Sequence, residues 1–270
     1  MHAVSNHRGA AVSAPVADSA TIGLWHMDEP GGDRVTDDGP LHLDATAGID
    51  TRIDFGRFRS ARVFSRSIES FLYVPYSPGL ETSTGITVEA WIQPFSYGAQ
   101  ELTPIACRWT QQANEQSWLF GIVGFKLALS SIALTSPRYH SQLVQLGLPR
   151  HLIFALQPEE ASLPLAYFSV AEVELKRWTH VAASYDGHAI RFYINGRLDS
   201  QYAWDGRIRP TRSPLLVGNY LDPHWLTDFA DRLRVGSVVD RNPYYAFEGT
   251  IDELRISNVA RETFEGAGVR

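Results

Sequence analysis

Short runs of alternating apolar and polar residues recur along the chain from about residue 21. The runs at 70–75, 86–92 and 178–185 are rich in β-branched and aromatic residues, and clusters of Gly, Pro, Asp and Asn separate them. Strands of this length and spacing are typical of two antiparallel sheets packed face to face. The pattern therefore predicts an all-β sandwich in which alternate side chains are buried between the sheets.

Two turn sequences order three strands in the second half of the chain. The Asp-Gly pair at 186–187 and the Asn-Gly pair at 195–196 are typical of tight hairpins. Between them Ile190, Phe192 and Ile194 alternate with more polar residues, which places one face of this strand against a core. We expect three consecutive antiparallel strands here.

Two segments depart from the strand pattern. After Asp222 apolar residues recur at helical spacing, with Asp222 as the N-cap, Pro223 at the first helical position and Gly236 as the stop. This segment predicts one short helix in a late insertion. The Leu-rich segment 124–150 fits a strand and a helix equally well and stays unassigned.

No internal repeat or linker divides the chain, which favours one domain. We expect a flexible N-terminal segment at 1–20, the domain over 21–260 and a C-terminal tail at 261–270. No stretch approaches the roughly 20 apolar residues of a membrane-spanning helix. The first 20 residues also lack the apolar stretch of a secretory signal, so no export signal is visible in this sequence.

Composition narrows the possible partners. Hydrophobic residues make up 44% of the chain and charged residues 20%, as in a folded globular protein. The formal net charge of -6 argues against nucleic acid as a partner, because phosphate binding needs a basic face. The single cysteine, Cys107, excludes an internal disulfide, and we expect it to be a small buried hydrophobe.

Ordered motifs run through both halves of the chain. They are GLWHMDE at 23–29, ARVF at 61–64, FLYVP at 71–75, ITVEAWIQP at 86–94, WTHVA at 178–182, FYING at 192–196, LLVG at 215–218 and FEGTIDELRI at 247–256. In this order they resemble the laminin G-like jelly-roll domain of the concanavalin A-like lectin/glucanase superfamily. The resemblance covers about residues 21 to 260 and implies an antiparallel two-sheet jelly roll. It implies no single function, because this fold hosts lectins, adhesion modules and enzymes.

Two aspartates are candidate ligands for a metal ion. Strict alternation places Asp28 on the face of Ile22 and Asp252 on the face of Leu254, so both acids would point toward the core. A carboxylate there needs a cation, an Arg or several backbone N–H donors. Calcium accepts such oxygens, and the resemblance implies a structural calcium at the corresponding place. The alternative is that Asp28 caps a turn and Asp252 accepts backbone hydrogen bonds.

The residues that invite a catalytic interpretation do not form a catalytic set. His180 alternates with small residues on a predicted strand, which favours a structural histidine. Glu172 and Glu174 share a strand face, but the E-x-D-x-x-E arrangement of glucanases in this superfamily is absent, and a solvated face explains them better. We therefore expect no catalytic residues.

Aromatic side chains in or beside predicted loops are candidates for ligand binding. Their flat rings can stack on sugar faces while neighbouring polar groups make hydrogen bonds. The turn at 242–243 can present the two residues after it to solvent. The candidate set is Trp204, Tyr220, Asn242, Tyr244 and Tyr245.

These observations favour a non-catalytic binding domain of an extracellular or cell-surface protein. We expect it to recognise a glycan or a protein partner through loops near the late insertion. The alternative is a structural or decoration subunit of a larger assembly, with the insertions 124–150 and 221–246 as contacts, because an exposed Leu-rich stretch favours a partner surface. A polysaccharide-active enzyme is the least favoured interpretation.

Overall fold

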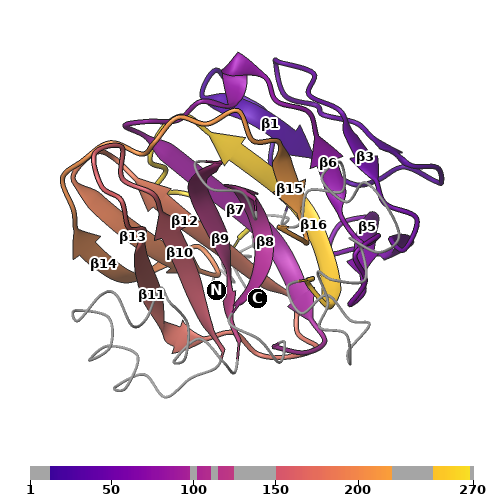
Figure 1. The fold of residues 1–270 in the computed structure, drawn as a ribbon. Coiled ribbons are helices and arrows are strands. Elements are labelled where there is room, and N and C mark those ends of the chain that lie inside the picture. Colours follow the sequence, from indigo (N-terminus) through magenta and orange to yellow (C-terminus); the bar gives the residue numbers. More distant parts are fainter. Residues whose placement is uncertain (1–12, 98–101, 111–114, 125–149, 221–245, 268–270) are drawn as a thin grey trace, which may run out of the picture.

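Two antiparallel sheets are stacked face to face in the computed structural model of the protein (Figure 1). The structure describes residues 13–97, 102–110, 115–124, 150–220 and 246–267. This sandwich confirms the predicted all-β class and the jelly-roll architecture. The helix predicted after Asp222 lies outside the described residues, and so do residues 125–149 of the Leu-rich segment.

The first sheet has eight strands and combines elements from both ends of the chain. Its order is β14 (Arg197–Ala203), β13 (Ala189–Ile194), β12 (Thr179–Tyr185), β7 (Ile86–Pro94), β16 (Gly249–Ser257), β5 (Ser60–Phe64) and β4 (Arg52–Phe55), and β1 (Thr21–Trp25) also pairs with β16. The two predicted hairpins are confirmed, since β12, β13 and β14 follow one another antiparallel.

The second sheet also has eight strands and packs over the first. Its order is β11 (Leu165–Glu172), β10 (His151–Leu156), β9 (Gln116–Val123), β8 (Leu102–Trp109), β15 (Leu215–Val217), β6 (Leu72–Val74), β3 (Ala45–Ala47) and β2 (Arg34–Val35). Within the described residues, the one helical element is the 3-10 turn η1 (Pro78–Leu80), which precedes β7. The described part of the chain contains no helix with the length and hydropathy of a membrane span.

Side chains from both sheets meet in one apolar core. Trp25 of β1, Phe120 of β9 and Phe192 of β13 are almost fully buried in it. Cys107 of β8 belongs to the same core, and burial raises the pKa of its thiol. The predicted role of Cys107 as a small buried hydrophobe is confirmed.

Side-chain hydrogen bonds join the edge strands β11 and β14 of the two sheets. The carboxylate of Asp199 on β14 accepts the N–H groups of Val170 at 2.7 Å and Ala171 at 2.9 Å, both on β11. The hydroxyl of Tyr202 on β14 donates to the carbonyl of Phe168 at 2.6 Å. This side of the sandwich is therefore closed by side chains rather than by backbone pairing.

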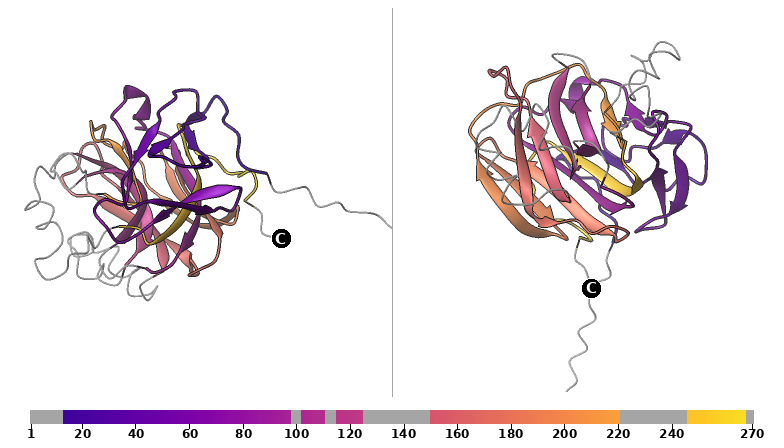
Figure 2. Two further views of the ribbon diagram at one scale, coloured as in Figure 1. Left: turned by 90° about the vertical axis from the view of Figure 1, so that its right-hand side faces the viewer. Right: turned by 60° about the horizontal axis from the view of Figure 1, so that its bottom comes forward.

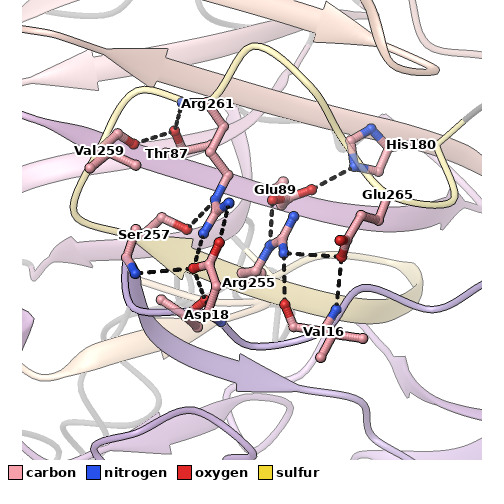
Figure 3. Close-up of polar contacts among 12 residues, drawn as sticks. Val16, Asp18, Thr87, Glu89, His180, Arg255, Ser257, Val259, Arg261 and Glu265 are labelled. Atoms are coloured by element: carbon pink, nitrogen blue, oxygen red, sulfur yellow. Dashed lines mark hydrogen bonds and ion pairs between the residues drawn. The ribbon is translucent and has the colours of Figure 1, made fainter.

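A buried ion network lies on the outer face of the first sheet (Figure 3). Arg255 of β16 donates from Nε to Oε1 of Glu89 on β7 at 2.7 Å, and Nε2 of His180 on β12 lies 3.0 Å from Oε2 of the same carboxylate. All three side chains are buried. Burial by itself would raise the pKa of Glu89, but His180 and Arg255 outweigh it and lower this pKa overall. His180 is thus buried and paired with Glu89, and its structural role stays a prediction.

The same network holds both ends of the described chain (Figure 3). Arg255 donates from Nη1 to the carbonyl of Val16 at 3.1 Å, and the carboxylate of Glu265 accepts the N–H of Val16 at 3.0 Å. Beside them Arg261 donates to both carboxylate oxygens of Asp18, at 2.6 and 2.9 Å. In the left view of Figure 2 the indigo segment before β1 and the yellow segment after β16 accordingly run close together.

Candidate functional site

The backbone is irregular just after β1 and in the middle of β16. The pairing of β16 with β7 is shifted between Asp252 and Arg255, and Glu253 within this bulge has a φ of 53°. Met27, just after β1, has a φ of 61°. Both are left-handed conformations that residues with a Cβ adopt at a cost of about 1 kcal/mol or more. At each place the backbone breaks the alternation of a regular strand.

The prediction that both aspartates share the core face is wrong, and the irregular backbone is the reason. Ile251 and Leu254 both reach the core, so the bulge between them turns Asp252 to the outer face of the sheet. There its Oδ2 accepts the N–H of Phe58 at 3.0 Å. Met27 occupies the core instead of its neighbour Asp28, which lines a cavity.

This cavity, which we call the acidic cavity, has a volume of about 720 Å³. Asp28 on its wall accepts the N–H of Ser60 at 3.0 Å and lies 3.6 Å from the guanidinium of Arg59. His26 lies 2.5 Å from Glu253 through Nδ1 and 3.5 Å from Asp38 through Nε2. The wall therefore carries more carboxylates than cations. Its principal side chains are His26, Asp28, Glu29, Asp38, Phe58 and Arg59.

Asp252 and Glu253 are buried near this wall, and each has one carboxylate oxygen without a hydrogen bond. No described residue makes a hydrogen bond to Oδ1 of Asp252 or to Oε1 of Glu253. Burial raises the pKa of Asp252 to about 8 and also raises the pKa of Glu253, and the nearby charge of Asp28 adds to both shifts. The hydrogen bond that His26 makes to the carboxylate of Glu253 raises the pKa of His26. This part of the molecule would therefore be stabilised by an added positive charge.

The two predicted calcium ligands lie near each other, although not on the predicted face. The unpaired oxygens of Asp252 and Glu253, together with Asp28, are hard oxygen donors of the kind calcium accepts. Among the described residues, however, no three His, Cys, Asp or Glu side chains are arranged to hold one ion by themselves. A calcium ion here would need backbone carbonyls or water as further ligands, and the calcium site stays a prediction.

Trp204 follows β14 at one end of the sandwich, and its half-buried indole packs against the core and contacts Tyr185 and Gly206. The ring stacks on Tyr185, with centroids 4.7 Å apart and an interplanar angle of 34°. Gly206 also lies against the indole, where a Cβ would come within 2.6 Å of the ring. A glycine is therefore required beside the ring. The N–H of Trp204 donates to the carbonyl of His188 at 2.9 Å, which also fixes its backbone.

Trp204 lines a second cavity of about 290 Å³, which we call the Trp204 cavity. Glu159, Glu160 and Asp205 surround it, and Arg207 donates from Nε to Glu159 at 2.9 Å. The carboxylates are exposed to solvent and can accept hydrogen bonds. An aromatic ring with hydrogen-bonding groups at its edge is an arrangement that can hold a sugar ring.

The other predicted site residues have different positions. Tyr220 is half-buried and packs against the core, and its N–H donates to the side chain of Asn219 at 2.9 Å. Asn242, Tyr244 and Tyr245 lie outside the described residues. Of the five predicted ligand-binding residues, the structure therefore places Trp204 on a cavity.

The glutamates that a glycosidase mechanism would require are exposed, as the solvated-face interpretation predicts. Glu172, at the end of β11, pairs with Arg150 at 3.2 Å, and Glu174 pairs with Arg177 at 2.9 Å. Each carboxylate is thus neutralised by its own surface arginine.

The sequence interpretation missed the acids that surround Trp204. Glu159 and Glu160 come from the connection between β10 and β11, about 45 residues before Trp204. The only local signal was the sequence Trp-Asp-Gly at 204–206, in which a polar residue and a glycine follow an aromatic one. The pairing of the two loops could not be inferred from spacing.

The fold and the family match define the class of protein. A family model described as the concanavalin A-like lectin/glucanases superfamily, Laminin_G_3, matches residues 69–265. The chain therefore belongs to this superfamily, as the resemblance of its motifs implies. No curated protein matches the sequence.

Solved structures with the same fold include binding domains of toxins. The binding domain of Paraclostridial Mosquitocidal Protein 1 aligns with a TM-score of 0.57 and 12% identity, over 90% of this chain and 49% of that chain. The binding domain of botulinum neurotoxin serotype G aligns with a TM-score of 0.58 and 13% identity, over 89% of this chain and 48% of that chain. This chain thus spans about half the length of these toxin domains.

A third structure is matched over nearly its whole length. It is Domain 4 of AbnA, a GH43 extracellular arabinanase from Geobacillus stearothermophilus, in complex with arabinotriose. It aligns with a TM-score of 0.56 and 17% identity, over 89% of this chain and 93% of that chain. At these identities the three similarities show the common jelly-roll fold.

Proposed function

We propose that this protein is a non-catalytic glycan-binding domain whose ligand is held in the Trp204 cavity. The observation that carries the proposal is the fixed indole of Trp204 beside solvent-exposed carboxylates. A ring already held by Tyr185 and Gly206 loses little freedom when a sugar stacks on it, so more of the contact energy contributes to affinity.

The similar structures support a binding role. One of them is described with arabinotriose bound, and others are binding domains of toxins. The arabinanase is described as extracellular, which supports a location of this protein outside the cell or at its surface. Glu172 and Glu174 are exposed and each pairs with an arginine, which does not favour their use as the two free carboxylates of glycoside hydrolysis.

Replacing Trp204 by Ala should lower glycan affinity at least about tenfold, which corresponds to the loss of about 1.4 kcal/mol of stacking. The measurement is a glycan array followed by isothermal titration calorimetry with the glycans that bind, arabinotriose included. Asp205→Ala is a second variant, because its carboxylate is 82% exposed and its loss should weaken binding without disturbing the fold.

Phe55→Ala is the control for this experiment, since Phe55 is 89% exposed and lies on β4, outside the cavity. It should bind as the wild type does. Equal affinity of wild type and Trp204→Ala for every glycan that binds would refute the Trp204 cavity as the site. Absence of binding to any glycan would refute the proposed function itself.

We further propose that calcium stabilises the acidic cavity, with Asp28 and Asp252 among its ligands. The support is the unpaired oxygens behind the wall and the surplus of carboxylates on it. A bound cation would neutralise these carboxylates and fix the irregular backbone after β1 to the bulge of β16.

A further inference from the structure

A third cavity, of about 440 Å³, lies at the same end of the sandwich as Trp204. We call it the Tyr76 cavity, after the aromatic residue on its wall, whose exposed fraction is 39%. The buried guanidinium of Arg108 lies 5.8 Å from the centre of the Tyr76 ring and donates to Glu81 at 3.1 Å. The lining residues are Tyr76, Glu81, Glu115, Pro210, Thr211 and Arg212.

The Tyr76 and Trp204 cavities are neighbours, because one segment lines both. Residues 204–207 line the Trp204 cavity and 210–212 line the Tyr76 cavity. The three steps from Arg207 to Pro210 span at most about 11 Å of extended chain. This segment is the orange connection that leads to β15 in Figure 1.

A second chain segment links the two cavities independently. Glu81 lines the Tyr76 cavity, and two residues later the hydroxyl of Ser83 accepts a hydrogen bond from Arg207 of the Trp204 cavity at 3.2 Å. The carbonyl of Ser83 also accepts the N–H of Ile208 at 2.9 Å. Two separate stretches of chain therefore run between the cavities.

The backbone between the cavities is fixed by the sandwich. Ile208 is fully buried, and the N–H of Arg209 donates to the carbonyl of Gln157 at 2.8 Å. The hydroxyl of Ser117 on β9 donates to the carbonyl of Arg209 at 2.7 Å. The spacing between the two aromatic sites is therefore constant rather than adjustable.

We propose that the Tyr76 and Trp204 cavities are two subsites of one groove that binds a linear oligosaccharide chain rather than a single terminal sugar. This inference rests on the proposed function. Each ring can stack on one sugar of the same chain, and the fixed spacing selects chains long enough to reach both. A short glycan would occupy the Trp204 subsite alone.

The charge of the groove indicates the chemical class of the chain. The residues that line its two cavities carry five carboxylates and two guanidinium groups. Arg207 pairs with Glu159 and the buried Arg108 with Glu81, so carboxylates still outnumber the cations. Sulfated or uronic acid chains would be repelled by this surplus of negative charge. The ligand is therefore a neutral or amino-sugar oligosaccharide, whose hydroxyl or ammonium groups donate to the carboxylates.

Isothermal titration calorimetry with chains of increasing length tests the two subsites. The probes are arabino-, gluco- and chito-oligosaccharides of one unit to six units. For a chain type that binds, affinity should rise about tenfold or more once the chain reaches the second ring. Tyr76→Ala should abolish this gain and leave the affinity for the shortest binding chain unchanged, whereas Trp204→Ala should weaken every length.

Phe95→Ala is the matched control, because Phe95 is also 39% exposed and lines neither cavity. It should keep the full length dependence. Tyr76→Phe should keep it as well, because the ring remains. If Tyr76→Ala fails to fold, Glu115→Ala on the same wall should reduce the gain with chain length.

The outcomes separate this inference from the proposed function. Affinity that is independent of length, or a length dependence unchanged in Tyr76→Ala or its substitute Glu115→Ala, would overturn the second subsite while the Trp204 site stands. A preference for sulfated or uronic acid chains on the glycan array would overturn the assigned class of ligand. Failure of every chain to bind would overturn the subsites together with the proposed function.

Discussion

Replacing Arg255 by Met should lower the free energy of unfolding by about 3 to 5 kcal/mol, because it leaves a buried carboxylate without its main cation. Arg255 and Glu89 are both almost fully buried and lie 2.7 Å apart. In the variant Glu89 keeps only His180 as a partner. Arg255 also holds the carbonyl of Val16, so the N-terminal segment should loosen at the same time.

Urea denaturation followed by tryptophan fluorescence would measure this loss. Arg197→Met is the control, because Arg197 is exposed on β14 and its replacement should change stability by less than about 0.5 kcal/mol. The double variant Arg255→Met with Glu89→Leu removes both charges and should recover much of the stability. An Arg255→Met protein within about 1 kcal/mol of the wild type would contradict the role of this network.

Without calcium, the Asp252→Asn variant should become more stable than the wild type as the pH rises. Burial raises the pKa of Asp252 in the folded state to about 8, against 3.8 for an unperturbed aspartate. The protonated acid therefore stabilises the fold fully below about pH 4, and this stabilisation is lost as the pH rises through about 8. The loss amounts to at most about 1.4 kcal/mol per pH unit in this range. An asparagine side chain does not titrate, so the variant should not lose stability in this way.

Both proteins are denatured in the presence of a chelator at several pH values between 4 and 9. Because wild type and variant both contain His26 and Glu253, the contributions of these two residues to the pH dependence largely cancel in the comparison. Asp54→Asn is the control, since Asp54 is exposed on β4. It should follow the wild-type curve. A difference between wild type and Asp252→Asn that is independent of pH would contradict the raised pKa.

Added calcium extends the same experiment to the metal proposal. At pH 8 millimolar calcium should stabilise the wild type, because the ionised carboxylates become ligands, and it should have little effect on Asp252→Asn. A wild-type melting temperature that calcium does not change would rule out the calcium site.

The sandwich itself was predictable because its signals are local. The Asp-Gly and Asn-Gly turns define β12, β13 and β14, and the alternation at 86–92 predicts β7. Each of these features depends on neighbours in the sequence and on the two-residue period of a strand. Predictions from these features are correct wherever the strand is regular.

The faces of Asp28 and Asp252 could not be predicted because the strands are irregular next to them. The bulge in β16 depends on Glu253, and the turn after β1 on Met27, both with positive φ. Positive φ is expected at Gly or Asn, so neither residue signals the break in alternation. The proposed groove was hidden for a different reason, since Trp204, Glu159 and Tyr76 come from three distant connections of the chain.

The closure of β11 by Asp199 has a consequence for behaviour at high concentration. An edge strand with free N–H groups is a template on which a strand of another molecule can add, the first step of β-aggregation. The carboxylate of Asp199 occupies the N–H groups of Val170 and Ala171, as an added strand would. A side chain on the opposite sheet thus protects an edge that carries the exposed, apolar Val170.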